Sequence, residues 1–348
     1  RLAKMLVVST VFRCLRPMLA VVCGREFKDP FVSDPRTDEA RLRVAGRCCS
    51  DQLLMAEILN LFESACDRSS AEAYDLCNRN LLNYNLLNQM KSFQNKVLDM
   101  VSKAMTPYHA KRGRTPLQPF LMDSSTWDRH VELVRAVICS GLLPNVARVY
   151  VRSSKKKMIL RDGTRVSAQM KSVVQLDNID TCDGFVCFHE LIRTTQLFAS
   201  DLCLARPLAV AIFCGKVERC EDGLLCDNWI RLAADKELVN AVLLVREAAK
   251  RSIDRHVLGV GLGSKSAEVD LQAVLRALTG QAGGETHYHV EETSILSLPR
   301  ADVAPAYLDD MYYGRAGGLG MGRAQVSDWR YGMVPPVPGG FNGSAHGA

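Results

Sequence analysis

The sequence contains none of the contiguous motifs that mark a nucleotide-driven or a hydrolytic enzyme. It has no G-x-x-x-x-G-K-[ST] phosphate loop and no paired acidic motif after a strand-like run, so no standard site for a nucleoside triphosphate is predicted. The nearest imitation, "GVGLGSKS" at 259–266, lacks both the Gly-Lys-Ser order and a preceding buried strand. No G-x-S-x-G nucleophile elbow occurs. A triad can assemble from distant positions, but no spacing here favours one, so we predict no catalytic residue and no cofactor within this chain.

Metal-ligand spacings are missing too. The 13 cysteines are odd in number, form no C-x-x-C pair and lie mostly inside apolar runs, which is typical of small buried residues in a reducing compartment. Cys182, Cys187, Cys220 and Cys226 could form a zinc cluster only by assembling across strands, without the local spacing of a structural site. We therefore predict no metal site.

Long apolar runs are also absent. No stretch approaches the ~18 uninterrupted apolar residues that a membrane span needs, and arginines interrupt the apolar N-terminal stretch "RLAKMLVVSTVFRCL". We expect no membrane segment, and an intracellular location in the nucleus or cytoplasm, or in the mitochondrion.

What the chain does have is enough apolar sequence for several cores. At 348 residues, of which 47% are apolar, it is long enough for two or three domains. The net charge of +6 is modest for this length, so it permits a nucleic-acid partner without requiring one.

The first third of the chain has helical periodicity. Residues 1–24 form one apolar helical pattern, "FKDPFVSDPR" interrupts it, and a helix returns after the N-cap signal at Ser50 with apolar residues at Leu54, Ile58, Leu61 and Phe62. Two further helical segments, "AEAYDLCNRN" and "NLLNQMKSFQNKVLDMVSKAM", meet at an asparagine-rich junction that can cap the longer one. This pattern predicts a helical bundle, followed by the proline-rich linker "TPYHAKRGRTPLQP".

The period changes to alternation after a helix at "STWDRHVELVRAVICSGLL". We predict a small all-β barrel from the short runs "ARVYVRS", "KMIL", "RVSA", "FVCFHELI", "PLAVAIFCG" and "LLCDNWIRL". Helices are expected at "KELVNAVLLVREAAKRSIDRHV" and "SAEVDLQAVLRALTG". The Gly-, Pro- and Tyr-rich remainder is predicted to be a disordered tail, which either contacts single-stranded RNA loosely or only aids solubility.

Basic and hydroxyl side chains gather at the ends of the predicted strands. They comprise Lys155, Lys156, Lys157 and Arg161 at a hairpin, Lys171 and Ser172 after the next turn, and Arg193, Thr194 and Thr195 at the end of another strand. If these loops converge on one mouth of the barrel, the cations can neutralise phosphates and the hydroxyls can fix the register of a nucleic-acid strand. The alternative is a solvated charge run in which lysine protects a strand edge from pairing.

The order of these segments resembles the C-terminal region of DEAH-box RNA helicases of the RNA helicase A-like group. The resemblance runs through "KMLVVSTVFRCLRPMLAVVCGREFKDPF", "SDQLLMAEILNLFE", "RAVICSGLLPNVARVYV", "FHELIRTTQLFASD" and "WIRL", and covers residues 1 to about 256. It implies an α+β multidomain fold: an all-helical ratchet bundle, then an OB-fold barrel with flanking helices, then the tail. The implied divisions are a winged-helix end (1–30), the ratchet domain (31–125), the OB-fold region (126–256), a short helical extension (257–280) and the tail (281–348).

The resemblance also implies roles for individual residues. Asn83, Tyr84 and Asn85 match the start of the family's ratchet helix, so Asn83 and Asn85 join the predicted RNA-binding set, and Lys171, Ser172, Arg193 and Thr194 match barrel-loop positions. This chain departs from the family at Arg16, where Asp is common, at Gln52, where His is common, and at Gln169-Met170, where His-Pro is common. The last change removes a ring and a rigid turn beside the proposed RNA site.

Two functions follow from the resemblance. The first is an RNA-binding module of an ATP-dependent RNA helicase, in which upstream RecA-like domains would bind ATP and Mg²⁺ and this chain would guide single-stranded RNA. The second is a protein-interaction scaffold that recruits a helicase-activating partner, without catalysis of its own.

Overall fold

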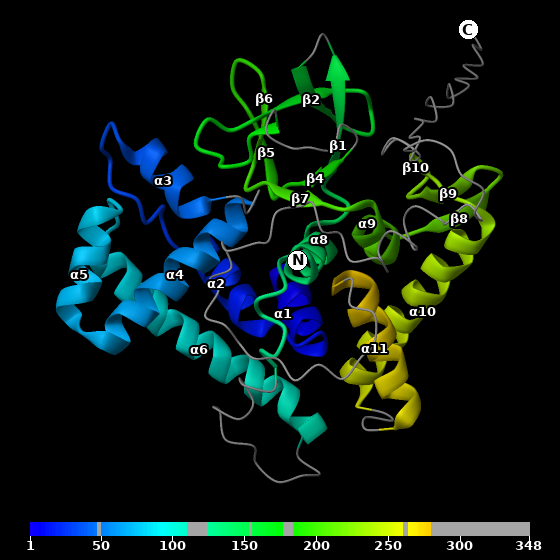
Figure 1. Ribbon diagram of the computed structural model, residues 1–348, viewed down its shortest axis with the longest axis horizontal. Coiled ribbons are helices and arrows are strands. Elements are labelled where there is room, and N and C mark those ends of the chain that lie inside the picture. Colours follow the sequence, from blue (N-terminus) through cyan, green and yellow to red (C-terminus); the bar gives the residue numbers. More distant parts are fainter. Residues whose placement is uncertain (47–49, 110–123, 153–154, 177–183, 260–263, 280–348) are drawn as a thin grey trace, which may run out of the picture.

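The computed structural model describes residues 1–46, 50–109, 124–152, 155–176, 184–259 and 264–279. Three parts of the molecule meet around the central helix α8 (Val131–Leu142): a helical half, a barrel above it, and a pair of helices on the side away from the helical half (Figure 1). This arrangement confirms the predicted α+β class, with a helical part first and a β-rich barrel with flanking helices second. The predicted tail, 281–348, lies outside the described residues.

The helical half consists of six helices: α1 (Leu2–Val11), α2 (Leu15–Glu26), α3 (Thr37–Ala45), α4 (Asp51–Arg68), α5 (Ser70–Arg79) and α6 (Tyr84–His109). The single helix predicted over 1–24 is in fact two helices. Arg13, between α1 and α2, takes a left-handed conformation with φ of 58°, which a continuous right-handed helix does not allow. The Ser50 N-cap is confirmed, since its Oγ accepts a hydrogen bond from the Leu53 N–H at 3.2 Å. Sequence reasoning missed α3, a short helix with few apolar residues.

The barrel is a seven-stranded sheet of order β5-β6-β3-β2-β1-β4-β7. Its strands are β1 (Val146–Arg152), β2 (Lys155–Ile159), β3 (Arg165–Ala168), β4 (Phe185–Cys187), β5 (Glu190–Arg193), β6 (Leu197–Ser200) and β7 (Cys203–Ala205). Alternate residues of these strands, among them Val149, Met158 and Val186, form a core inside the barrel. The predicted strand 147–153 is confirmed as β1, and "RVSA" is confirmed as β3.

The last two predicted barrel strands belong elsewhere. "PLAVAIFCG" is the helix α9 (Pro207–Phe213), not a strand, because Pro207 begins a helical turn after the extended Arg206. "LLCDNWIRL" turns back at Asp227 and Asn228, both with positive φ. Its two halves are β9 (Gly223–Cys226) and β10 (Ile230–Ala233), which form with β8 (Val217–Cys220) a separate three-stranded sheet.

Helices tie the barrel to the rest of the molecule. α8 (Val131–Leu142) is buried along nearly its whole length. The two predicted helices that follow the barrel are confirmed as α10 (Lys236–Leu258) and α11 (Lys265–Thr279); they pack against each other, and α11 also packs against α8. One large core contains residues of the helical half, of α8 to α11 and of the barrel strands that lie against α8. The barrel therefore packs against the helices through one continuous apolar core.

Candidate functional site

The three consecutive lysines begin the second strand of the β1–β2 hairpin, so their predicted place at a hairpin is confirmed. β2 begins at Lys155, and the antiparallel register places Lys155, Lys156 and Lys157 opposite Arg152, Val151 and Tyr150 of β1. Since side chains alternate along a strand, Lys156 shares a face with the fully buried Met158, whereas Lys155 and Lys157 lie on the outer face and are exposed. The lysine run is thus divided between two faces of the sheet.

The remaining barrel residues occupy separate loops. Arg161 is exposed in the β2–β3 turn, where Thr164 N–H donates to Asp162 Oδ1 at 2.9 Å. Arg193, Thr194 and Thr195 are exposed at the tip of the β5–β6 hairpin. β2 and β5 are separated by β3 and β6, or roughly 14 Å at the usual strand spacing. The cations of β2 and of the β5–β6 tip therefore do not form one cluster.

Ser172 has a structural partner. Its Oγ donates to Asp51 at 2.9 Å, and the same carboxylate accepts the backbone N–H groups of Val173 and Leu202, each at 2.8 Å. Asp51 is the first residue of α4, so this carboxylate joins the helical half to two loops of the barrel. Lys171, one position earlier, is exposed beside Met170, which is 95% exposed. Of the predicted pair, only Lys171 projects free of this contact.

Burial dominates the electrostatics of Asp51. Desolvation raises the pKa of its carboxyl above the usual value, although the hydrogen bonds from Leu202, Val173 and Ser172 act in the opposite direction. A buried carboxylate that accepts this many hydrogen bonds is a docking contact between two parts of the fold.

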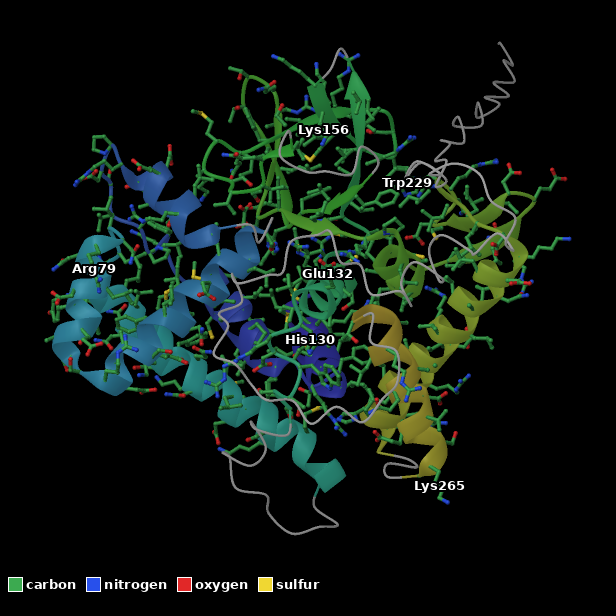
Figure 2. The ribbon with its side chains drawn as sticks, viewed as in Figure 1. Arg79, His130, Glu132, Lys156, Trp229 and Lys265 are labelled. Carbon is green, nitrogen blue, oxygen red and sulfur yellow. The ribbon has the colours of Figure 1, made fainter. Side chains whose placement is uncertain are left out.

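Asn83 and Asn85 lie at the start of α6, far from the lysines. Asn83 caps that helix, because its Oδ1 accepts the Leu86 N–H at 3.0 Å, which confirms the predicted capping role of this junction. Asn85 is exposed on the first turn. Figure 2 shows the same separation, with Arg79 near this junction in the helical half and Lys156 on the barrel.

A pocket that sequence reasoning missed lies along α6. It has a volume of about 370 Å³ and is lined by Phe27, Asn88, Gln89, Ser92, Phe93 and Lys96. The rings of Phe27 and Phe93 meet edge to face with centroids 5.6 Å apart. Asn85, Asn88, Gln89, Ser92, Asn95 and Lys96 recur at helical spacing of three and four residues, which could have indicated one polar face, but Phe27 comes from the end of α2 and no local pattern connects it to them.

Three kinds of side chain line this pocket: aromatic rings, uncharged polar groups and a lysine. Aromatic rings stack on bases, amides and hydroxyls bond to base edges and ribose, and a lysine ammonium neutralises a phosphate. Such a combination suits an unpaired nucleotide better than a duplex, whose bases are stacked on one another.

Neither a metal centre nor a membrane helix is found in the described part of the chain. Among those residues no group of three or more His, Cys, Asp or Glu side chains is placed to hold a metal ion. None of the described helices is both long enough and apolar enough to cross a bilayer.

Comparison with known families agrees with this architecture. Residues 1–77 match a family described as the helicase-associated domain (HA2), ratchet-like, and residues 134–217 match the oligonucleotide/oligosaccharide-binding (OB) fold. These two matches, in this order and together with the helicase relatives below, support assignment of the chain to the C-terminal region of a DEAH-box RNA helicase. The resemblance seen in the sequence is thereby confirmed, while the division of the chain into the five predicted ranges stays a prediction.

Helicase relatives extend over most of the chain. It is 23% identical over 284 residues to the DExH-box ATP-dependent RNA helicase DExH1 of Arabidopsis thaliana and 24% identical over 258 residues to the human ATP-dependent DNA/RNA helicase DHX36. These alignments cover 77% and 71% of this chain, but only 27% and 25% of the relatives. The chain therefore spans about a quarter of the length of these relatives.

Proposed function

We propose that this helicase C-terminal region is an RNA-binding module that guides single-stranded RNA along α6 and the barrel loops. ATP hydrolysis with Mg²⁺ would occur in RecA-like domains of the parent protein, and this chain by itself would hydrolyse no ATP. The observation that carries the proposal is the pocket on α6, where two phenylalanine rings, uncharged polar groups and Lys96 stand together. Loop cations Arg161, Lys171 and Arg193 would add backbone contacts on the barrel.

The test is binding of a fluorescently labelled single-stranded RNA to the whole chain, measured by anisotropy over a range of salt concentrations. Phe93→Ala removes a ring from the pocket and should weaken binding about fivefold or more, because stacking contributes about 1–3 kcal/mol per base. Lys96→Gln should reduce the slope of log affinity against log salt by about 0.7, the value for one phosphate contact on a single strand.

Met100→Ala is the matched control, since Met100 lies on the same helix, is 68% exposed and is not part of the pocket. It should leave affinity unchanged. Wild-type affinity in both Phe93→Ala and Lys96→Gln would refute the role of the pocket.

A protein-interaction scaffold is the second candidate, and the edge strand β5 favours it. β5 pairs with β6 on one side only, and Leu191 and Ile192 are 39% and 36% exposed. Exposed edge strands of this kind can accept a strand from another protein. Crosslinking in cells separates the candidates, because adducts to protein alone on residues 153–195 would favour the scaffold.

A further inference from the structure

Two cysteines from different elements lie together where α9, α10 and β9 pack against one another (Figure 1). Cys214 is the C-cap residue of α9, and Cys226 is the last residue of β9. Their sulfur atoms are hydrogen-bonded to each other, and both are free thiols. The sequence showed Cys226 only as one member of an unlikely zinc cluster, so this pair is a product of the tertiary structure.

Backbone contacts fix the place of the two cysteines. Lys216, two residues after Cys214, donates its N–H to Asp227 Oδ1, and the N–H of Asp227, directly after Cys226, donates to the Lys216 carbonyl. Both hydrogen bonds are 2.8 Å long. Cys226 is also paired with both neighbouring strands of its sheet. The two sulfurs therefore meet at a junction that the backbone itself holds.

A guanidinium lies against the first of these sulfurs. Arg246 of α10 donates to three backbone carbonyls at the C-terminal end of α9, at 2.9, 2.8 and 2.7 Å, those of Ala211, Ile212 and Gly215. Its Nη1 also lies 3.8 Å from Cys214 Sγ. A helix C-terminus by itself disfavours an anion, so Arg246 supplies the positive charge that a thiolate at this position needs.

The two thiols of the pair are unequal. The hydrogen bond from Cys226 lowers the pKa of Cys214 and Arg246 acts in the same direction, against the opposing effects of burial and Asp227. The same hydrogen bond, with burial, raises the pKa of Cys226. Because the thiolate is the nucleophilic form of cysteine, Cys214 is the sulfur that attacks and Cys226 is the one that keeps its proton.

Only small reagents can reach this pair. Cys214 is 3% exposed, but Gly215 and Lys216, which follow it, are both exposed. The sulfur thus lies directly beneath a surface loop. Local opening of that loop is enough to admit a molecule as small as hydrogen peroxide.

We propose that Cys214 and Cys226 are a thiol modification site, which hydroperoxides convert to a reversible disulfide. The sulfur of Cys214 attacks one oxygen of hydrogen peroxide and the O–O bond breaks. The displaced hydroxide takes the Cys214 thiol proton, which leaves water and a sulfenic acid. The sulfur of Cys226 then attacks the sulfenic sulfur, so that the S–S bond forms, the S–O bond breaks and a second water leaves with the Cys226 proton. Two electrons pass from the sulfurs to the peroxide, and this chemistry is independent of RNA binding.

The experiment treats the whole reduced chain with a small molar excess of hydrogen peroxide, alkylates the remaining thiols and maps disulfides by mass spectrometry of tryptic peptides. The expected product links the peptide containing Cys214 to the peptide containing Cys226. Fragment spectra distinguish these residues from Cys203 and Cys220, which lie in the same two peptides. Dithiothreitol should restore both thiols.

Two variants separate the steps. C226S keeps a hydroxyl donor beside Cys214 but removes the second sulfur, so a sulfenic acid should accumulate at Cys214, where dimedone traps it. C220S removes a half-buried cysteine of the same small sheet and should form the disulfide as wild type does.

Cys139 and Cys187 are the matched control within the chain. Their sulfurs are 3.5 Å apart and both residues are fully buried. The hydrogen bond with Cys139, together with burial, raises the pKa of Cys187, so this pair should stay reduced.

Three results would overturn the proposal. The first is a wild-type chain in which Cys214 and Cys226 remain alkylated thiols or are linked only between two chains, as a non-reducing gel reveals. The second is a C226S chain without dimedone-labelled Cys214. The third is equal oxidation of the Cys139 and Cys187 pair, which would show that proximity of two sulfurs, and not the contact with Arg246, decides the reaction.

Discussion

Asp128 is a buried acid whose ionisation the fold opposes. Its Oδ2 lies 3.8 Å from Arg16 Nε, and its side chain is only 13% exposed. Burial raises the pKa of this carboxyl to about 8, and Arg16 only partly offsets that effect. The cation beside Asp128 is thus Arg16, at a position where the resemblance to the helicase family implied an aspartate.

The raised pKa predicts a pH-dependent stability. Between the unfolded value near 4 and the folded value near 8, the native state binds the proton more tightly than the unfolded state, so the free energy of unfolding falls as pH rises. The slope from this residue is at most about 1.4 kcal/mol per pH unit. Asp128→Asn should flatten the fall, as measured by urea unfolding between pH 5 and pH 8. Asp254→Asn, an exposed control, should keep the wild-type slope, and an Asp128→Asn slope equal to wild type would contradict this account.

At the scale of elements, one carboxylate on α11 links this helix to α10. Asp270 accepts hydrogen bonds from Arg251 Nη2 and Arg255 Nη1, each at 2.6 Å, and is itself 8% exposed. The hydrogen bond from Arg251 is the main cause that holds the pKa of Asp270 below its usual value. The pair of helices therefore depends on an acid that neutralises two cations at their interface.

Removal of that acid should loosen α11 locally. Asp270→Ala leaves Arg251 and Arg255 facing each other without an anion, and we expect a loss of about 1–3 kcal/mol. Hydrogen exchange of α11 amides should speed up while the barrel amides keep their protection. Glu268→Ala, an exposed acid on the same helix, is the control. Equal exchange in the two variants would show that the carboxylate does not hold the hairpin.

Sequence periodicity predicted some of the helices and missed others. The long helices α4, α6, α8, α10 and α11 follow directly from apolar residues at helical spacing. α9 does not, because a run of seven mostly apolar residues has no period that separates a buried helix from a buried strand. α3 was missed because its buried residues are only Ala40, Val44 and Ala45.

At the scale of the whole molecule, Asp51 joins the helical half to the barrel. Its carboxylate accepts from residues 121 and 151 positions further along the chain, Ser172 and Leu202. Arg25 forms an ion pair with Asp201 in the same seam, and Gln52 donates to the Asp201 carbonyl. Gln52, at a position where the resemblance implied a histidine, thus makes a polar contact between the two halves.

Loss of this contact should uncouple the halves. Asp51→Ala leaves two backbone N–H groups without their acceptor, and we expect a destabilisation of about 3 kcal/mol or more. Urea unfolding followed by separate helical and aromatic signals should change from one transition towards two. Asp38→Ala provides the control, since Asp38 also lies in the first turn of a helix but is exposed. A single transition at the wild-type midpoint would show that the apolar contact alone couples the halves.

The sequence by itself determined the helical periodicity, the change to alternating strands, the Ser50 and Asn83 caps and the family, because each depends on residues close together in the chain or on their order along it. The tertiary structure decided that Lys155 and Lys157 lie on the outer face of the sheet, that Ser172 donates to Asp51, and that Phe27 contacts Phe93 of α6. These are contacts between distant segments, and their geometry depends on strand register and helix packing. The candidate binding surfaces arise from that packing, while the residue types that compose them were already visible in the sequence.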